Sequence, residues 1–296
     1  MTKVLITGAN SFIGTNFRRF SQYSDIEEVS LLNRQPEDIE FSKYDIVLHL
    51  AAIVHKSKKT KEQEYYFINR DLCLRVAVLA KKAGVKHFIF LSTVKVYGKF
   101  VPGSDPWDED SDCNPEDAYG KSKYEAELAL RKLEDSGFII AIVRTPIVYG
   151  PGVKANMKRL ISLIEKVPAL PFKNVNNGRC YTYSGNLVGY IDRIIEIKAS
   201  GTFLVMDDSS LSTTDLVTFL AKFLGKRIIL YKVPDMFVRF LGSVNPGAFD
   251  RLYGSFYLNN SKTKKLLKYK PLFSTEEGIR KMISSYLENK ISKKLS

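Results

Sequence analysis

A chain of 296 residues that is 45% hydrophobic and 26% charged has the composition of a globular protein with a large core, which excludes a disordered or fibrous class. Its formal charge of +13, from 45 Lys and Arg against 32 Asp and Glu, fits an anionic partner, although Lys-rich solvated faces explain most of the excess. Cys73, Cys113 and Cys180 are widely spaced, no signal peptide precedes the first strand, and no apolar run approaches ~20 residues. We therefore expect reduced thiols, a cytoplasmic location and no membrane insertion.

The first unit of structure is predicted at the N-terminus. Val4-Leu5-Ile6 is a short apolar run typical of a buried parallel strand, and Thr7 to Gly14 follows as a turn that leads into a helix. Gly8 permits a tight turn, and Gly14 permits close packing of helix on strand. The N-terminus of that helix would face a pyrophosphate, so the stretch predicts a dinucleotide-binding βα unit.

The second strand is predicted over Glu28 to Asn33. Its end is where this fold reads the adenosine ribose, about 20 residues beyond the glycines. The sequence has Asn33-Arg34 there rather than an acidic residue, which is either an ordinary polar loop or a cofactor contact. In the second case Arg34 could pair with a 2′-phosphate, and NADP should bind at least as well as NAD.

Two further strands end in small or hydroxyl side chains. Asp45 to Ala52 is a buried strand whose closing Leu50-Ala51-Ala52 lets backbone approach a cofactor, and its His49 is more often a packed core histidine than a catalyst. A helix is predicted from Lys61 to Lys82. His87 to Thr93 is a strand that ends in two hydroxyls, at the edge where parallel sheets bind ligands.

Tyr119 and Lys123 lie at i and i+4 in a segment of good helix formers, so they project from one helix face. An ammonium beside a phenol favours the phenolate, which would lower the pKa of Tyr119 and suit it to proton exchange. Such a pair is common on solvated helices, and only the surrounding motifs favour the catalytic interpretation.

The regular βα pattern ends near Gly150, after a strand from Phe138 to Val143. We therefore predict an α/β fold, a Rossmann-like doubly wound parallel sheet in a dinucleotide-binding domain over residues 1–150. Residues 151–296 would form a smaller, mainly substrate-binding α/β part. No internal repeat and no metal site is predicted.

Taken in order, these stretches resemble the extended short-chain dehydrogenases/reductases of the NAD-dependent epimerase/dehydratase family, in the branch that modifies nucleotide sugars. The family's T-G-x-x-G-x-x-G is matched from Thr7 to Gly14, except that Ser11 replaces the middle glycine. Its S-[ST]-x-x-V-Y-G is matched from Ser92 to Gly98, and its R-P-x-[NLI]-V-Y-G-P-G resembles Arg144 to Gly152.

The resemblance implies the roles of individual residues. Tyr119 would be the acid/base, Lys123 would lower its pKa and hold the nicotinamide ribose, and Thr93 would hydrogen-bond the reacting oxygen. Asn69 would steady this site through hydrogen bonds. Cofactor contacts are expected from Gly8, Asn10, Ser11, Phe12, Ile13, Gly14, Asn33, Arg34, Leu50, Ala51, Ala52, Tyr119 and Lys123, and substrate contacts from Thr93, Val94, Lys95, Asn156, Arg179 and Arg251.

The resemblance leaves the reaction open between two activities. The first is reduction, with NADP (or NAD), of the C4 ketone of a UDP-2-acetamido-2,6-dideoxy-hexos-4-ulose in surface-polysaccharide synthesis, favoured by Ser11 and Asn33-Arg34. The second is a UDP-hexose 4-epimerase with bound NAD. Dehydratases and decarboxylases of the family carry an acidic residue after the catalytic hydroxyl, whereas this chain has Val94-Lys95, so neither activity is expected.

A third alternative is a non-catalytic NAD(P)-binding module. Thr93, Tyr119 and Lys123, which such a module need not keep, count against it. RNA binding is not expected, because the chain has no basic motif with stacked aromatic residues. A homodimer through the helices near 61–82 and 118–135 is expected by resemblance.

Overall fold

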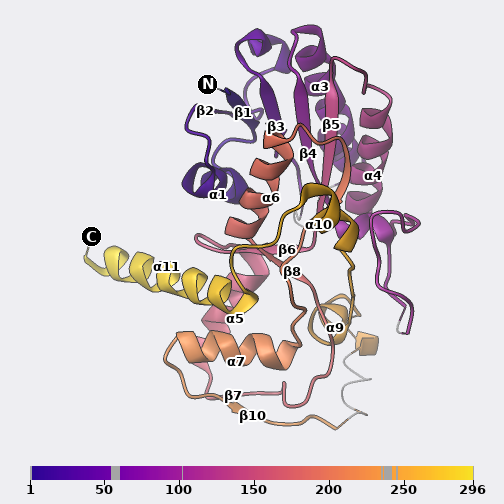
Figure 1. The fold of residues 1–296 in the computed structure, drawn as a ribbon. Helices are drawn as coiled ribbons and strands as arrows, with labels where there is room; N and C mark the ends of the chain where they lie inside the picture. Colours follow the sequence, from indigo (N-terminus) through magenta and orange to yellow (C-terminus); the bar gives the residue numbers. More distant parts are fainter. Residues whose placement is uncertain are drawn as a thin grey trace.

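The computed structural model describes residues 2–54, 61–101, 103–234, 236, 242–244 and 246–295, without the side chains of 246–248, 251 and 293–295. Its centre is a six-stranded sheet in the order β2-β1-β3-β4-β5-β9, in which every neighbouring pair is parallel (Figure 1). The strands are β1 (Val4–Thr7), β2 (Ile26–Val29), β3 (Ile46–His49), β4 (His87–Thr93), β5 (Ile139–Thr145) and β9 (Gly201–Leu204). The predicted Rossmann-like α/β class is confirmed.

Helices cover both faces of this sheet, as a parallel sheet requires. Alternating side chains of β1 point to opposite faces of the sheet: Val4 and Ile6 belong to the core on one face, and Leu5 belongs to the core on the other. The first face carries α1 (Phe12–Phe20) and α6 (Ser184–Glu196). The opposite face carries α2 (Glu62–Tyr66), the π-helical turn η3 (Phe67–Leu72), α3 (Cys73–Lys82) and α4 (Ala118–Arg131) (Figure 1).

Helices α5 and α7 lie below the sheet in Figure 1, and their buried side chains form a further cluster with those of the start of α11. Two short parallel pairs complete this part, β6 with β8 and β7 with β10. Its elements are β6 (Ile147–Tyr149), α5 (Ala155–Lys166), β7 (Ala169–Leu170), β8 (Tyr181–Tyr183), α7 (Thr213–Phe223), β10 (Ile229–Leu230), α9 (Pro246–Tyr253), α10 (Ser261–Leu267) and α11 (Thr275–Leu295).

The chain enters this second part at β6 and returns to the sheet afterwards. Strand β9 is the sixth strand, and Leu187 and Ile191 of α6 are fully buried against the same core as β1. The division into 1–150 and 151–296 stays a prediction, and the N-terminal sheet is completed by segments from beyond residue 150.

The predicted second strand is wrong in position. It spans Ile26–Val29 rather than Glu28 to Asn33, because Thr7 pairs with Val29 and the chain bends away directly afterwards. The helix predicted from Lys61 to Lys82 is present but contains the π-helical turn Phe67–Leu72. Such turns are frequent at functional sites.

The state of the cysteines and the character of the helices can be read from the structure. Cys73, Cys113 and Cys180 are all free. Among the described residues, none of the helices combines the length and the apolar character that crossing a bilayer would need.

Candidate active site

The glycine turn lies between the carboxyl ends of β1 and β3. Gly8 has φ +100°, and a Cβ there would come within 2.8 Å of the Ala51 amide nitrogen, so only glycine fits. Ser11 is the N-cap of α1, because its Oγ accepts a hydrogen bond from the Gly14 amide at 3.0 Å. Ser11, which replaces the family's middle glycine, therefore accepts a hydrogen bond from one of the backbone amides in the first turn of α1.

The start of α1 fits a diphosphate. The amides of Phe12 and Ile13 open the helix and have no intrahelical partner, and the first turn contains no acidic residue. Backbone donors and the positive end of a helix dipole favour phosphate oxygens at such a position. The donor chemistry of this turn therefore suits a dinucleotide, with Phe12 and Ile13 as the residues that would hold its pyrophosphate.

The structure identifies an acidic residue at this loop that the sequence argument missed. The carboxylate of Glu28, on β2, accepts a hydrogen bond from the Asn10 amide at 2.9 Å and lies 3.8 Å from the Arg18 guanidinium. Its side chain is only 11% exposed. Glu28 stands 20 residues beyond Gly8, which is the usual spacing for a ribose-binding acid. This spacing in the sequence could therefore have identified Glu28 if the end of β2 had been predicted correctly.

Asn33 and Arg34, which were expected at the end of the strand, lie four and five residues past it in an exposed bend. The guanidinium of Arg34 donates to the Asp38 carbonyl and lies close enough to Tyr44 to influence its pKa. The residue that directly follows β2 is Ser30, whose hydroxyl accepts from the Leu32 amide at 3.3 Å. The described contacts of Arg34 are thus with its own loop.

The segment around the end of the third strand contacts the glycine turn directly and, through Asn69, the helix that carries Tyr119 and Lys123. His49 is fully buried, with its Nδ1 2.8 Å from the Thr7 hydroxyl, and burial lowers its pKa to about 3, which confirms a packed neutral histidine. After Leu50, Ala51 and Ala52, the backbone of Ile53 exchanges two hydrogen bonds with the Asn69 side chain. Asn69 also donates to the Ser122 hydroxyl at 3.0 Å, so it ties this loop to the helix of the Tyr/Lys pair.

Tyr119 lies in the first turn of α4, which Asp117 caps through the Gly120 amide at 2.7 Å. Burial raises the pKa of its phenol to about 12, a hydrogen bond with Thr93 opposes the rise, and the nearby charge of Asp117 adds to it. The expected lowering of the Tyr119 pKa is therefore wrong for this structure, because desolvation outweighs the favourable contacts. Tyr119 and Thr93 do come together, as predicted.

Lys123, one turn later, is only 2% exposed and carries its ammonium 3.8 Å from the centre of the Phe90 ring. Burial lowers its pKa to about 8, and the neighbouring Cys73 and Glu127 partly offset that. The Lys123 side chain carries N–H donors, so it could donate hydrogen bonds to the hydroxyls of a ligand.

Val94 and Lys95 follow Thr93 in the 3₁₀ turn η4 (Val94–Tyr97). Val94 is buried, whereas Lys95 is half-exposed, forms an ion pair with Asp117, and lies 5.9 Å from the centre of the Tyr119 ring. A cation therefore stands beside the phenol at the position where the family's dehydratases carry a carboxylate.

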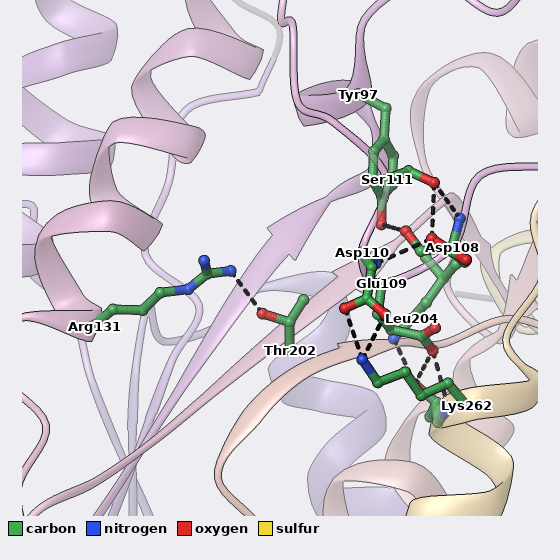
Figure 2. Close-up of polar contacts among 10 residues, drawn as sticks. Tyr97, Asp108, Glu109, Asp110, Ser111, Arg131, Thr202, Leu204 and Lys262 are labelled. Carbon is green, nitrogen blue, oxygen red and sulfur yellow. Dashed lines mark hydrogen bonds and ion pairs between the residues drawn. The ribbon is translucent and has the colours of Figure 1, made fainter.

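The loop after η4 is fastened to α10, as Figure 2 shows. Tyr97 donates to the Asp108 carbonyl at 2.6 Å, and Asp110 pairs with Lys262 at 2.6 Å. Glu109 is buried and accepts the Thr263 amide at 3.0 Å, while the Thr263 hydroxyl accepts from the Leu204 amide at 2.8 Å. We call residues 107–111 the strap, because their contacts join η4 to α10.

The expected substrate-binding residues of the C-terminal part lie on α5, on α9 and in the segment before β8. Asn156 is exposed in the first turn of α5. Arg179 donates to the carbonyls of Asp250 and Gly254, and its guanidinium lies 4.8 Å from the Phe256 ring centre. Arg251 belongs to α9, but its side chain lies outside the described residues. Their contact with a nucleotide sugar stays a prediction.

Comparison with known proteins gives relatives along nearly the whole chain. A UDP-glucose 4-epimerase of Vibrio cholerae is 32% identical over 314 residues, covering 96% of this chain and 95% of the relative. An N-acetyl-alpha-D-glucosaminyl-diphospho-ditrans,octacis-undecaprenol 4-epimerase of Escherichia coli O157:H7 is 28% identical over 276 residues, covering 84% and 79%.

Solved structures share the fold at lower identity. A UDP-glucuronic acid 4-epimerase from Bacillus cereus, in complex with NAD, superposes with a TM-score of 0.75 at 22% identity, covering 97% of this chain and 99% of that one. A dTDP-4-dehydrorhamnose reductase from Clostridium acetobutylicum gives 0.74 at 20% identity, covering 97% and 100%. The model of the NAD dependent epimerase/dehydratase family matches residues 4–205. With its glycine turn, its Tyr/Lys helix and this match, the chain belongs to the NAD dependent epimerase/dehydratase family of NAD(P)-dependent nucleotide-sugar enzymes.

Proposed function

We propose that this protein is a UDP-hexose 4-epimerase that holds NAD and inverts the configuration at C4 of its sugar. The observation that carries a reaction at a sugar oxygen is the approach of Thr93 to the Tyr119 phenol, near enough for the Thr93 side chain to lower the phenol's pKa, at the carboxyl edge of the sheet and one turn from Lys123. One acid/base and one hydroxyl donor can serve both halves of an epimerisation.

The protein's residues would act as follows. Thr93 would orient the C4 hydroxyl, and the phenolic oxygen of Tyr119 would take its proton and later return it. Lys123 would supply positive charge that stabilises the phenolate, while Phe12 and Ile13 hold the pyrophosphate at the start of α1. When bound, a nicotinamide dinucleotide would supply the redox chemistry at C4.

The choice of epimerase over reductase rests on Glu28. A carboxylate at the glycine turn suits a ribose with free hydroxyls and repels a 2′-phosphate, which favours retained NAD over exchangeable NADPH. The ketoreductase was favoured partly because Asn33-Arg34, rather than an acid, was expected at the end of β2, and Glu28 supplies that acid. The 32% identity with a UDP-glucose 4-epimerase over 96% of the chain adds support.

The second candidate is the NADPH-dependent 4-ketoreductase acting on a UDP-2-acetamido-2,6-dideoxy-hexos-4-ulose. Two observations favour it: Ser11 adds a side chain to the phosphate turn, and the residue that directly follows β2 is Ser30 rather than an acid. Under either proposal the partner is a UDP-sugar, and the homodimer and the cytoplasmic location remain predictions.

The test is to purify the protein, assay it for bound NAD, and supply each class of substrate separately. The epimerase predicts interconversion of UDP-glucose-type and UDP-galactose-type sugars with no net cofactor consumption. Stoichiometric oxidation of NADPH with the 4-keto sugar, and no epimerisation, would instead establish the reductase. Binding of NAD(P) without turnover of either sugar would point to the binding module.

A further inference from the structure

A buried ion pair lies directly behind the proposed reaction edge. Glu127 of α4 is 0% exposed and Arg144 of β5 is 2% exposed. The Arg144 guanidinium approaches the carboxylate with its Nη2 2.6 Å from Oε2 and its Nε 3.2 Å from both oxygens. Burial disfavours the charged form of Arg144, but hydrogen bonding and attraction to Glu127 outweigh it and raise the pKa of Arg144.

A third side chain completes the contact from β4. The hydroxyl of Ser92 donates to Oε1 of Glu127, and Ser92 directly precedes Thr93. On α4, Glu127 lies one turn beyond Lys123 and two turns beyond Tyr119. The carboxylate of Glu127 therefore joins three elements, two of which carry the proposed catalytic side chains.

Neighbouring side chains connect the same ion pair to the strap and to β9, the strand at the edge of the sheet. The Arg144 guanidinium lies 4.9 Å from the centre of the Tyr97 ring, and Tyr97 donates to the strap at Asp108 (Figure 2). Arg131, one turn beyond Glu127, approaches its carboxylate at 3.9 Å and donates to the Thr202 hydroxyl of β9 at 2.8 Å (Figure 2).

Stability alone gives no reason for this arrangement. Desolvating two charges offsets much of their attraction, and well-packed apolar side chains of similar volume often serve equally well in a core. The charged hydrogen bonds of Arg144 and the hydrogen bond of the Ser92 hydroxyl differ from apolar packing in one respect, because they fix the direction and the distance between three backbone segments.

We propose that Glu127, Arg144 and Ser92 are positioning residues, which hold β4 and α4 in the one register that brings Thr93 to Tyr119 and Lys123 to the same edge. None of the three touches the reacting atoms. The inference rests on the proposed function, since it assigns these residues a purpose in proton transfer at a sugar oxygen. A misplacement near 1 Å can lower a rate by about 100-fold, so a positioning role predicts large effects on kcat.

The experiment compares kcat and KM in the full-length protein. Ser92→Ala should lower kcat by about tenfold with little change in the KM for the UDP-sugar, and Ser92→Thr, which keeps the hydroxyl, should restore most of the lost kcat. The triple variant Ser92→Ala/Glu127→Leu/Arg144→Met replaces the charged cluster by apolar side chains. It should melt near the wild-type temperature but lose about 100-fold in kcat.

The control is Asp135→Asn, which breaks the exposed 2.6 Å pair of Lys81 with Asp135 near the far end of α4 and should leave kcat unchanged. A folded triple variant, or a Ser92→Ala variant, with wild-type kcat overturns the inference. A triple variant that does not fold leaves the decision to the Ser92→Ala and Ser92→Thr pair, since those variants change a single side chain.

Wild-type protein without turnover of any tested sugar would overturn the proposed function separately. Amide hydrogen exchange over residues 92–97 and 118–127 then decides the inference. Faster exchange in both segments of Ser92→Ala, at unchanged global stability, supports it, and unchanged exchange overturns it.

Discussion

Tyr119 and Lys123 occupy consecutive turns of α4, yet burial acts on them in opposite directions. The pKa of the phenol rises to about 12 and that of the ammonium falls to about 8, because a low-dielectric environment disfavours the charged form of each. Both groups are thereby shifted toward their neutral forms. The contact that opposes this rise at Tyr119 comes from the Thr93 side chain.

Tyr119→Phe should lower kcat by at least about 100-fold and leave cofactor affinity nearly unchanged, because only the proton-carrying oxygen is lost. Lys123→Met should impair both, since the ammonium would also hold the ribose. Steady-state kinetics together with a cofactor titration measure the two effects. A Tyr119→Phe variant that keeps most of its activity would show that the site is assigned to the wrong residues.

Glu28→Gln should raise the affinity for NADP relative to NAD by about tenfold, because it removes a negative charge beside the phosphate turn while keeping a hydrogen-bond acceptor for the Asn10 amide. Fluorescence titration with both cofactors gives the ratio. Arg34→Glu is the matched variant, because Arg34 is the other residue proposed to select between the two cofactors. If Arg34→Glu changes the ratio and Glu28→Gln does not, selectivity lies in the loop after β2.

At the scale of elements, the strap and α10 stabilise one another across more than 150 residues of sequence. The Glu109 carboxylate replaces a local cap at the N-terminus of α10, where the Asn260 side chain forms no capping hydrogen bond. Trp107 adds apolar contact, with its ring stacked 5.3 Å from Tyr97 and edge-on to Phe100. The strap therefore depends on contacts that form only in the folded chain.

Glu109→Ala should destabilise the protein by about 2 kcal/mol, because it leaves the buried amide and hydroxyl of Thr263 without their acceptor. Urea denaturation measures the change. Asp110→Asn is the control, since its ion pair with Lys262 is exposed and should contribute little. Equal midpoints for Glu109→Ala and wild type would mean that the strap is not held by this carboxylate.

At the scale of the whole molecule, Asp207 links the sheet to the C-terminal part. It follows β9 and is 1% exposed, and its carboxylate accepts from the Tyr149 hydroxyl at 2.7 Å, the Tyr183 amide at 2.9 Å and the Asn186 amide at 2.7 Å. Burial nevertheless dominates and raises the pKa of Asp207 to about 6, from an ordinary value of 3.8.

A raised pKa means that the folded chain binds a proton at Asp207 where the unfolded chain has already released it. The stabilisation is complete below about pH 4 and is lost as pH rises through about 6, with a magnitude of about 3 kcal/mol. Asp207→Asn should flatten this part of the stability profile, measured by urea denaturation between pH 4 and 8. Parallel profiles for the two proteins would contradict the shift.

The sequence by itself determined the class of fold, most of the strands and the family, because these depend on short-range patterns. Buried apolar runs, the glycine turn from Gly8 to Gly14, and Tyr119 and Lys123 at one helical turn can all be read within a few residues. Strand β4 was predicted with its observed bounds, His87 to Thr93.

Only the tertiary structure decided which side chains meet across the chain and how far each is buried. The end of β2 depends on its register with β1, so Glu28 at the glycine turn could be recognised only after Thr7 was paired with Val29. The contact of Ser92 with Glu127 spans 35 residues and that of Asn69 with Ser122 spans 53. The pKa of Tyr119 rose rather than fell because desolvation depends on everything packed around a group, which neighbours in sequence do not reveal.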